Sequence, residues 1–334
     1  MKLARSCIFA FNSNIDLVAH AGLGEAESLF GMRIFTGGEA KISAETAQRV
    51  SSSFKWKEAR IGGQAGNMAN AAAALGVKCL AHAYNLSPRQ RKLFAKGVEP
   101  VGERTGNESV HYVLELKLRN GRRDRLILTH DPANSSLLIS PKFASRSLEF
   151  VSNGCDRAVV SGFHLLDAKN AEARLSAASQ LIRRWRKANP SLRVHFEAGE
   201  FSDANVAGLV AKSILPLVDS IGMNERELFA FAPRISALPN ISEIMVHTAG
   251  YASAASRIRG RDALARALSF GHALAAHRAG TGKFAGLASA LRLMKKVRGA
   301  KSDENGVSVP SIKITPKFTL GLGDSFSAGY FLAE

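Results

Sequence analysis

The sequence predicts an α/β protein with a mostly parallel sheet and a small second domain above it. Short β-rich apolar runs alternate with helical patterns of period 3.6 along most of the chain, as expected for consecutive βα units. Two long segments interrupt this alternation. The length of 334 residues accommodates one large α/β domain with a smaller appendage, or two domains.

The expected elements follow one another as strand and helix units. The predicted strands are Cys7–Phe11, Lys78–Tyr84, Arg157–Ser161, Arg193–Glu197, Asp219–Gly222, Glu243–His247 and Ser311–Thr315. The predicted helices are Gln64–Leu75, Ala168–Lys187, Glu225–Phe231, Arg261–Arg278, Gly286–Val297 and Asp324–Ala333. The polar stretch Val297–Val307 is predicted to be a surface loop.

The two interruptions, Leu17–Arg60 and roughly Val101–Glu149, carry glycine turns and serine runs. In the second, His111–Leu118 and Arg125–Thr129 flank the dipeptide Asn120-Gly121, a strong signal for a β-hairpin. We therefore expect residues 17–60 and 101–150 to form the small domain. The large domain is then expected to comprise residues 1–16, 61–100 and 151–334.

Composition limits the function classes. No apolar run reaches the ~18 residues of a membrane helix, and Met1–Ser6 is unlike a signal peptide, so a cytoplasmic protein is expected. Lysine and arginine outnumber acidic residues by 45 to 28, and the net charge of +17 attracts anions. The basic clusters match no nucleic-acid motif, so nucleic-acid binding is not expected. Cys7, Cys79 and Cys155 each lie in or beside an apolar stretch and are expected to be buried thiols.

The most informative motif is Gly321-Leu322-Gly323-Asp324, where a glycine turn leads into the last predicted helix. The first N–H groups of a helix lack intrahelical partners and the helix dipole adds positive charge, so this turn suits a phosphoryl group. Asp324 is then placed to accept a proton from a hydroxyl that attacks phosphorus. The alternative is an aspartate that only caps the helix.

Polar residues also follow earlier strands, where open α/β sheets bind their ligands. Asn12–Asp16 follows the first strand and offers amides and a carboxylate, which suit a polyhydroxylated substrate. Gly62, Gly63 and Gln64 open an alanine-rich helix, where small residues permit close approach of a ligand. An Asx-rich turn in the first segment and tight helix–sheet packing in the second are the alternatives.

Two acidic motifs have both a metal and a structural interpretation. His195 and Glu197 alternate on a strand and share one face, and Asn224 and Glu227 flank the first turn of a later helix. In one interpretation Glu197 and Glu227 hold waters of a Mg²⁺ ion that also binds substrate phosphates. In the other, Asn224 and Glu227 form a variant capping box.

In their order along the chain these motifs resemble the ADP-dependent sugar kinases, the glucokinase and 6-phosphofructokinase group of the ribokinase-like superfamily. The matching segments are Asn12–Asp16, Arg60–Asn70, Ser161–Phe163, His195–Glu197, Gly222–Glu227, His247-Thr248 and Gly321–Asp324. The resemblance covers the chain from end to end. It implies a ribokinase-like three-layer α/β/α large domain and a small α/β lid that closes over the sugar.

The resemblance also implies roles for individual residues. Asp324 would activate the sugar hydroxyl, and Gly321, Leu322 and Gly323 would supply the anion hole. Glu197 and Glu227, with Asn224, would organise Mg²⁺ and phosphates. The implied sugar contacts are Asn14, Asp16, Gly62, Gly63 and Gln64.

The implied reaction transfers the terminal phosphoryl group of ADP to a hydroxyl of glucose or fructose 6-phosphate with Mg²⁺, as in glycolysis. Glucokinases of this family hold glucose with a lid glutamate, for which the candidates are Glu25 and Glu27. Phosphofructokinases need lid cations for the 6-phosphate, for which the candidates are Arg119, Arg122, Arg123 and Arg125.

Two other functions stay open: an ATP-dependent ribokinase-like sugar or nucleoside kinase, and a non-catalytic sugar or nucleotide sensor. In each case the expected partners are a sugar or sugar phosphate and a nucleotide, and the chain is expected to be a monomer or small homo-oligomer.

Overall fold

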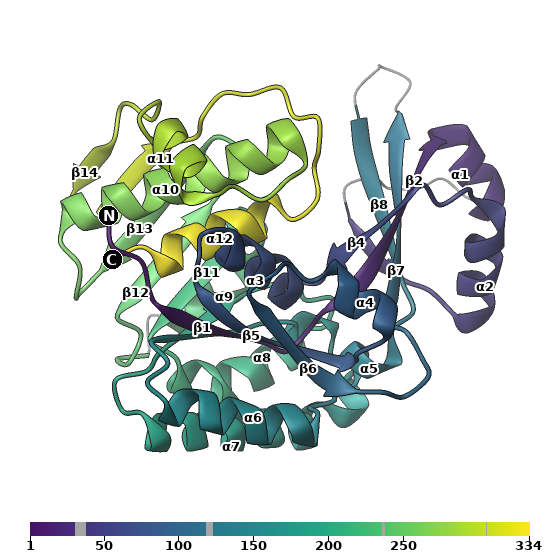
Figure 1. Cartoon of the computed structure of the whole chain (residues 1–334), viewed down its shortest axis with the longest axis horizontal. Helices are drawn as coiled ribbons and strands as arrows, with labels where there is room; N and C mark the ends of the chain where they lie inside the picture. Colours follow the sequence, from purple (N-terminus) through teal and green to yellow (C-terminus); the bar gives the residue numbers. More distant parts are fainter. Residues whose placement is uncertain (31–37, 118–122, 236–237, 305) are drawn as a thin grey trace.

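A large, mostly parallel sheet forms the centre of the protein in the computed structural model, which describes residues 1–30, 38–117, 123–235, 238–304 and 306–334 (Figure 1). Its strand order in these residues is β14 (Lys301–Asp303), β15 (Gly306–Pro310), β13 (Tyr251–Ser256), β12 (Glu243–His247), β11 (Ser220–Asn224), β10 (Arg193–Glu197), β9 (Arg157–Val160), β1 (Ser6–Ala10), β5 (Lys78–Asn85) and β6 (Val98–Glu103). The strands from β12 to β6 run parallel, whereas β13, β15 and β14 pair antiparallel at one edge. The predicted parallel sheet is confirmed.

Two layers of helices cover this sheet (Figure 1). One layer contains α6 (Pro141–Ser152), α7 (Ala171–Ala188), α8 (Ala204–Ser213) and α9 (Glu225–Ile235), and the other contains α3 (Gln64–Ala74), α10 (Arg261–Thr281), α11 (Leu287–Met294) and α12 (Leu322–Leu332). In α7 the buried residues recur at helical spacing, from Leu175 through Ala178 and Ile182 to Trp185, so one stripe of the helix packs on the sheet. The expected three-layer α/β/α arrangement is confirmed.

A second sheet lies beside the large sheet, with α1 (Leu23–Phe30) and α2 (Ala44–Ser53) on its outer side (Figure 1). Its strand order in the described residues is β3 (Glu39–Lys41), β8 (Arg123–Thr129), β7 (Val110–Lys117), β2 (Asn14–Gly22) and β4 (Glu58–Gly62). The opposite face carries Val18 and Val113, which pack against Phe318 and Leu320 in the segment before α12. This face looks toward the large sheet.

The predicted hairpin is confirmed, because β7 and β8 pair antiparallel from His111 to Lys117. Its turn at Asn120-Gly121 lies outside the described residues, as do Arg119, Arg122 and the side chain of Arg123. The strands of the small sheet fall within residues 14–62 and 110–129. The division into a large domain and a lid stays a prediction.

The shorter helical segments are α4 (Pro88–Leu93), α5 (Pro132–Ser135) and the 3₁₀ turns Phe163–Leu165, Ala168–Asn170 and Leu215–Leu217.

The strand predicted at Ser311–Thr315 is wrong. β15 ends at Pro310 and contributes the buried Val307 and Val309 to the sheet, where it pairs with β13. β14 and the start of β15 therefore lie in the predicted loop Val297–Val307. The alternation of Ile312 and Ile314 has another origin, since both side chains line the pocket described below.

Cys7, Cys79 and Cys155 are buried and free, as predicted. Burial raises the pKa of each thiol, which keeps all three protonated at neutral pH. In the described ranges, no helix has both the length and the apolar character needed to cross a bilayer.

Candidate active site

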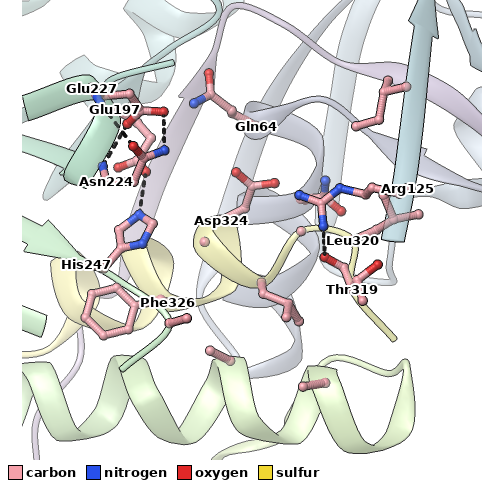
Figure 2. A pocket seen from close by; sticks show the side chains of 18 of the residues that line it. Gln64, Arg125, Glu197, Asn224, Glu227, His247, Thr319, Leu320, Asp324 and Phe326 are labelled. Carbon is pink, nitrogen blue, oxygen red and sulfur yellow. Dashed lines mark hydrogen bonds and ion pairs between the residues drawn. The ribbon is translucent and has the colours of Figure 1, made fainter. Parts of the chain in front are cut away.

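A pocket of about 480 Å³ opens between the small sheet and the carboxyl ends of the large sheet's strands (Figure 2). Asn14 and Gly62 lie behind Asp16 and are not among its lining residues. The structure brings the other predicted site residues together in this pocket, namely Asp16, Gly63, Gln64, Glu197, Asn224, Glu227, Gly321, Leu322, Gly323 and Asp324.

The turn before α12 depends on its glycines. Gly321 has a φ of 63°, a left-handed conformation that favours glycine. A Cβ atom on Gly321 would lie 3.0 Å from Cγ of Asn67, and one on Gly323 would lie 3.0 Å from Cε1 of His247. The N–H of Ser325 donates to Gly321 O over 3.0 Å, so the N–H groups before it precede the helical ladder. The turn therefore offers backbone donors to an anion in the pocket.

Asp324 projects into the pocket from the first turn of α12 (Figure 2). Burial raises its pKa to about 7; the negative charge of Glu197 adds to this effect, and a hydrogen bond from Asn67 opposes it. A carboxyl group with a pKa near neutrality is well matched to general-base catalysis, because it is partly ionised and still basic.

Glu197 lies at the centre of a buried network. Its Oε1 accepts a 2.7 Å hydrogen bond from Ser327 Oγ on α12, and its Oε2 lies 3.1 Å from His195 Nε2. His247 Nε2 is 3.9 Å from Oε1. Burial alone would raise the pKa of Glu197, but the hydrogen bonds and charges of His195 and His247 bring it down to about 2. A fixed negative charge therefore lies beside Asp324.

Asn224 and Glu227 form the capping box that the structural alternative predicted. Asn224 Oδ1 accepts a 3.0 Å bond from Glu227 N, and the Glu227 carboxylate accepts 2.8 Å bonds from both Asn224 N and Asn224 Nδ2. Burial raises the pKa of Glu227 to about 7, with the Asn224 bond opposing and the charge of Glu197 reinforcing this shift. Both residues also line the pocket, so capping the helix does not prevent them from contacting a ligand.

The carboxylates suit a hydrated cation better than a closed metal cage. Within the residues that the structure describes, no group of three or more His, Cys, Asp or Glu side chains is arranged to hold a metal ion. The carboxylate oxygens of Glu197 and Glu227 already accept bonds, and each retains capacity for a water molecule. The charge of Glu197 raises the pKa of both Glu227 and Asp324, a repulsion that a cation would relieve. Since Mg²⁺ keeps several of its waters, these residues fit a magnesium ion bound through water.

Asp16 faces the pocket from β2. Asn14 Nδ2 donates to Asp16 Oδ1 over 2.6 Å, and a Cβ atom on Gly62 would lie 2.1 Å from the same oxygen, so any larger residue there would force Asp16 to move. His111 on β7 is the register partner of Asp16, and its Nε2 lies 3.4 Å from Oδ2 of the buried Asp131. Asn14 and Gly62 thus support a polar wall formed by Asp16 and His111.

Gln64 uses both ends of its side-chain amide inside the protein. Its Nε2 donates to Ala198 O, and its Oε1 accepts a 3.1 Å bond from Gly162 N. Gly63 has a φ of 73°, and a Cβ atom there would lie 2.6 Å from Asn12 O. These residues fasten the start of α3 to the loops after β1, β9 and β10. Their contact with a sugar stays a prediction.

The structure adds pocket residues that sequence reasoning did not identify. Glu25 and Glu27 are not among the lining residues, whereas Glu39 is. Of the four candidate cations, Arg125 lines the pocket and donates from Nη1 to Thr319 O over 2.9 Å (Figure 2). The other unforeseen lining residues include His111, Ile127, His164, His272, Ala275, Ala276 and Ala279.

A family model described as the ADP-specific phosphofructokinase/glucokinase conserved region matches residues 36–238. The ADP-specific phosphofructokinase of Pyrococcus furiosus is 27% identical over 372 aligned residues, covering 87% of this chain and 81% of that protein. The ADP-dependent glucose/glucosamine kinase of Pyrococcus abyssi is 26% identical over 349 residues, covering 84% and 76%.

Solved structures resemble the whole chain. An ADP-dependent kinase in complex with fructose 6-phosphate and ADPβS superposes with a TM-score of 0.81 at 20% identity, covering 99% of this chain and 94% of that one. Adenosine kinase from Trypanosoma brucei brucei superposes with a TM-score of 0.53 at 16% identity, covering 76% and 82%. At these identities the likeness concerns the fold, and it confirms the predicted ribokinase-like class.

Proposed function

Because the chain belongs to the ADP-specific phosphofructokinase/glucokinase family, whose members phosphorylate a sugar hydroxyl, we propose that it transfers the terminal phosphoryl group of ADP to a hexose, with glucose preferred to fructose 6-phosphate. The observation that carries this proposal is the position of Asp324. It lies in one pocket with a glycine turn suited to phosphate and with the polar wall around Asp16.

Asp324 acts as the base. The sugar hydroxyl oxygen attacks the β-phosphorus of ADP, the bond from this phosphorus to the bridging oxygen breaks, and AMP leaves. The hydroxyl proton passes to the Asp324 carboxylate. The N–H groups of Leu322 and Gly323 stabilise charge on the phosphoryl oxygens as it is transferred. A positioned base of this kind contributes typically about 10²- to 10⁴-fold in rate.

Glu197, Glu227 and Asn224 would hold the waters of Mg²⁺ beside the phosphates. When bound, the ion neutralises phosphate charge and helps to hold ADP in position. The negative charge of Glu197 is fixed by its hydrogen bonds, so this residue would hold the hydrated ion at one side of the pocket.

The nucleotide would lie along α10. Ala275, Ala276 and Ala279 form a wall of small apolar side chains there, and Ile312 and Ile314 line the pocket from the segment after β15. A flat base can pack between such surfaces. This leaves the wall of Asp16 and His111 for the sugar.

Charge near that wall favours a neutral sugar. Glu39 lines the same pocket as Asp16 and His111, so its carboxylate belongs to the wall that would meet the sugar. A sugar phosphate beside Glu39 and Asp16 would meet two carboxylates, whereas sugar hydroxyls can donate hydrogen bonds to them. We therefore assign the role of the lid glutamate to Glu39. Fructose 6-phosphate remains the second candidate because Arg125 lines the same pocket.

A coupled assay of ADP and ATP against glucose and fructose 6-phosphate tests the proposal. The expected result is highest kcat/KM for ADP with glucose. Preference for ATP would favour the ribokinase-like alternative. Preference for fructose 6-phosphate would indicate that Arg125 binds the 6-phosphate. Binding of sugar and nucleotide without turnover would favour a sensor and contradict the proposal.

A further inference from the structure

The segment Lys317–Leu320, called the strap below, runs directly into the glycine turn at Gly321. The N–H groups of Lys317 and Phe318 both donate to Ala279 O of α10, over 2.9 and 3.0 Å. Thr319 and Leu320 line the active-site pocket. The strap is therefore fixed to the large domain at one end and continues into the anion-binding turn at the other.

Two guanidinium groups contact the ring of Phe318. Arg60 Cζ, on β4 of the small sheet, is 3.9 Å from the ring centroid, and Arg278 Cζ, on α10, is 4.6 Å from it. Arg60 also pairs with Glu58 through Nη2, and Arg278 donates from Nη1 to Gly282 O. In the described part of the chain, Arg60 Nη1 and Arg278 Nε are buried without a hydrogen-bond partner, which leaves the aromatic ring as a contact for both cations. Phe318 itself is only 5% exposed.

The small sheet touches the strap at further points. Val18 on β2 and Val113 on β7 pack against Phe318 and Leu320, and Arg125 on β8 donates to Thr319 O over 2.9 Å. Together with Arg60, these residues connect β2, β4, β7 and β8 to the strap. Its position therefore depends on the position of the small sheet.

The same strands carry the polar wall proposed to bind the sugar. Asp16 and Val18 are two residues apart on β2 and therefore share a face. Asp16 is also the register partner of Arg60 on β4 and of His111 on β7. Asp16 is thus connected through Val18 and Arg60 to Phe318.

We propose that Phe318 is a positioning residue that couples the sugar wall to the anion-binding turn through the strap. The proposal rests on the proposed function, since it requires a sugar at Asp16 and a phosphoryl group at Gly321–Gly323. Because coupling between two binding sites is reciprocal, sugar and nucleotide each strengthen the binding of the other. Phe318 touches neither substrate and acts through the strap.

Calorimetric titration of ADPβS with and without saturating glucose measures this coupling. The wild-type protein is expected to bind ADPβS at least about fivefold more tightly with glucose present. In Phe318→Leu this gain falls below about twofold and kcat falls about tenfold, while the Kd for ADPβS alone changes less than about threefold. Phe284→Leu is the matched control, because Phe284 lies 4.0 Å from the same Arg278 Cζ but outside the cluster of Val18, Val113 and the strap.

A second variant, Arg60→Met, leaves Phe318 in place and removes the guanidinium that the small sheet contributes to its ring. It is expected to reduce the coupling as well. If circular dichroism shows that Phe318→Leu does not fold, Arg60→Met tests the proposal in its place. The proposal would be overturned if the folded Phe318→Leu or Arg60→Met kept the wild-type coupling, or if Phe284→Leu lost as much coupling as Phe318→Leu. A wild-type enzyme that turns over glucose without coupling would overturn it as well. Absence of any wild-type turnover would instead reject the proposed function.

Discussion

Ser327 Oγ donates a 2.7 Å hydrogen bond to Glu197 Oε1, and Ser327 lies one helical turn after Asp324 on α12. Residues three apart on a helix are neighbours on its surface. This bond therefore ties the helix that carries the proposed base to the buried carboxylate of Glu197. It makes α12 the common support of both groups.

Ser327→Ala is expected to loosen Glu197 and to raise the Mg²⁺ concentration for half-maximal activity several-fold. Ser147→Ala is the control, since Ser147 Oγ is equally buried and accepts a 2.8 Å bond from Trp185 Nε1 far from the pocket. The control should lose about 1–3 kcal/mol of stability, because a buried donor is left unpaired, and should keep its Mg²⁺ dependence. An unchanged Mg²⁺ requirement in Ser327→Ala would contradict the assignment of Glu197. The same result in Glu197→Gln would contradict it too.

Gly62→Ala is expected to raise the KM for the sugar at least about tenfold, because the new Cβ would displace Asp16 from a position 2.1 Å away. Steady-state kinetics measure this effect. Gly208→Ala on α8 is the control, because a Cβ there has nothing within 4 Å. Equal KM values for the two variants would show that Asp16 does not contact the sugar.

Stability should depend on pH through Asp324. Its pKa is raised to about 7 in the folded protein, against about 3.9 for an unperturbed aspartate. The folded state therefore binds this proton more tightly than the unfolded state, and the side chain lowers stability progressively as pH rises from about 4 to about 7. Asp324→Asn removes this penalty, so its Tm should exceed the wild-type Tm by more at pH 8 than at pH 4.5. A Tm difference that does not change with pH contradicts the raised pKa.

Glu39→Gln is expected to raise the KM for glucose about tenfold, since hydrogen bonds to a charged group contribute about 1.5–3 kcal/mol. The KM for fructose 6-phosphate should fall or stay constant, because one negative charge is removed. Glu25→Gln serves as the control, because Glu25 is exposed on α1 outside the pocket. A glucose KM that responds equally to both changes would remove Glu39 from the sugar wall.

Local patterns were sufficient to predict the parts of the site that one segment builds. The glycine turn before Asp324 and the capping box of Asn224 and Glu227 each depend on a few consecutive residues. Glu39 and His111 were not predicted as site residues because long-range pairing places them there. His111 reaches the pocket only because β7 lies beside β2, in register with Asp16.

The dependence on long-range pairing also explains why the strand predicted at Ser311–Thr315 is wrong. Alternating Ile312 and Ile314 have the period of a strand, but no neighbouring strand pairs with them in the described structure. Their side chains line the pocket instead. Periodicity thus identifies which side chains share a face, whereas the partner of that face depends on the tertiary structure.

Turnover of Asp324→Asn with ADP and the preferred sugar is the most direct test of the central claim. The variant should lose about 10³-fold or more in kcat, with the Kd values for sugar and ADPβS within about threefold of wild type, because only the proton acceptor is removed. Retention of most of the wild-type kcat would contradict the assignment of Asp324 as the base.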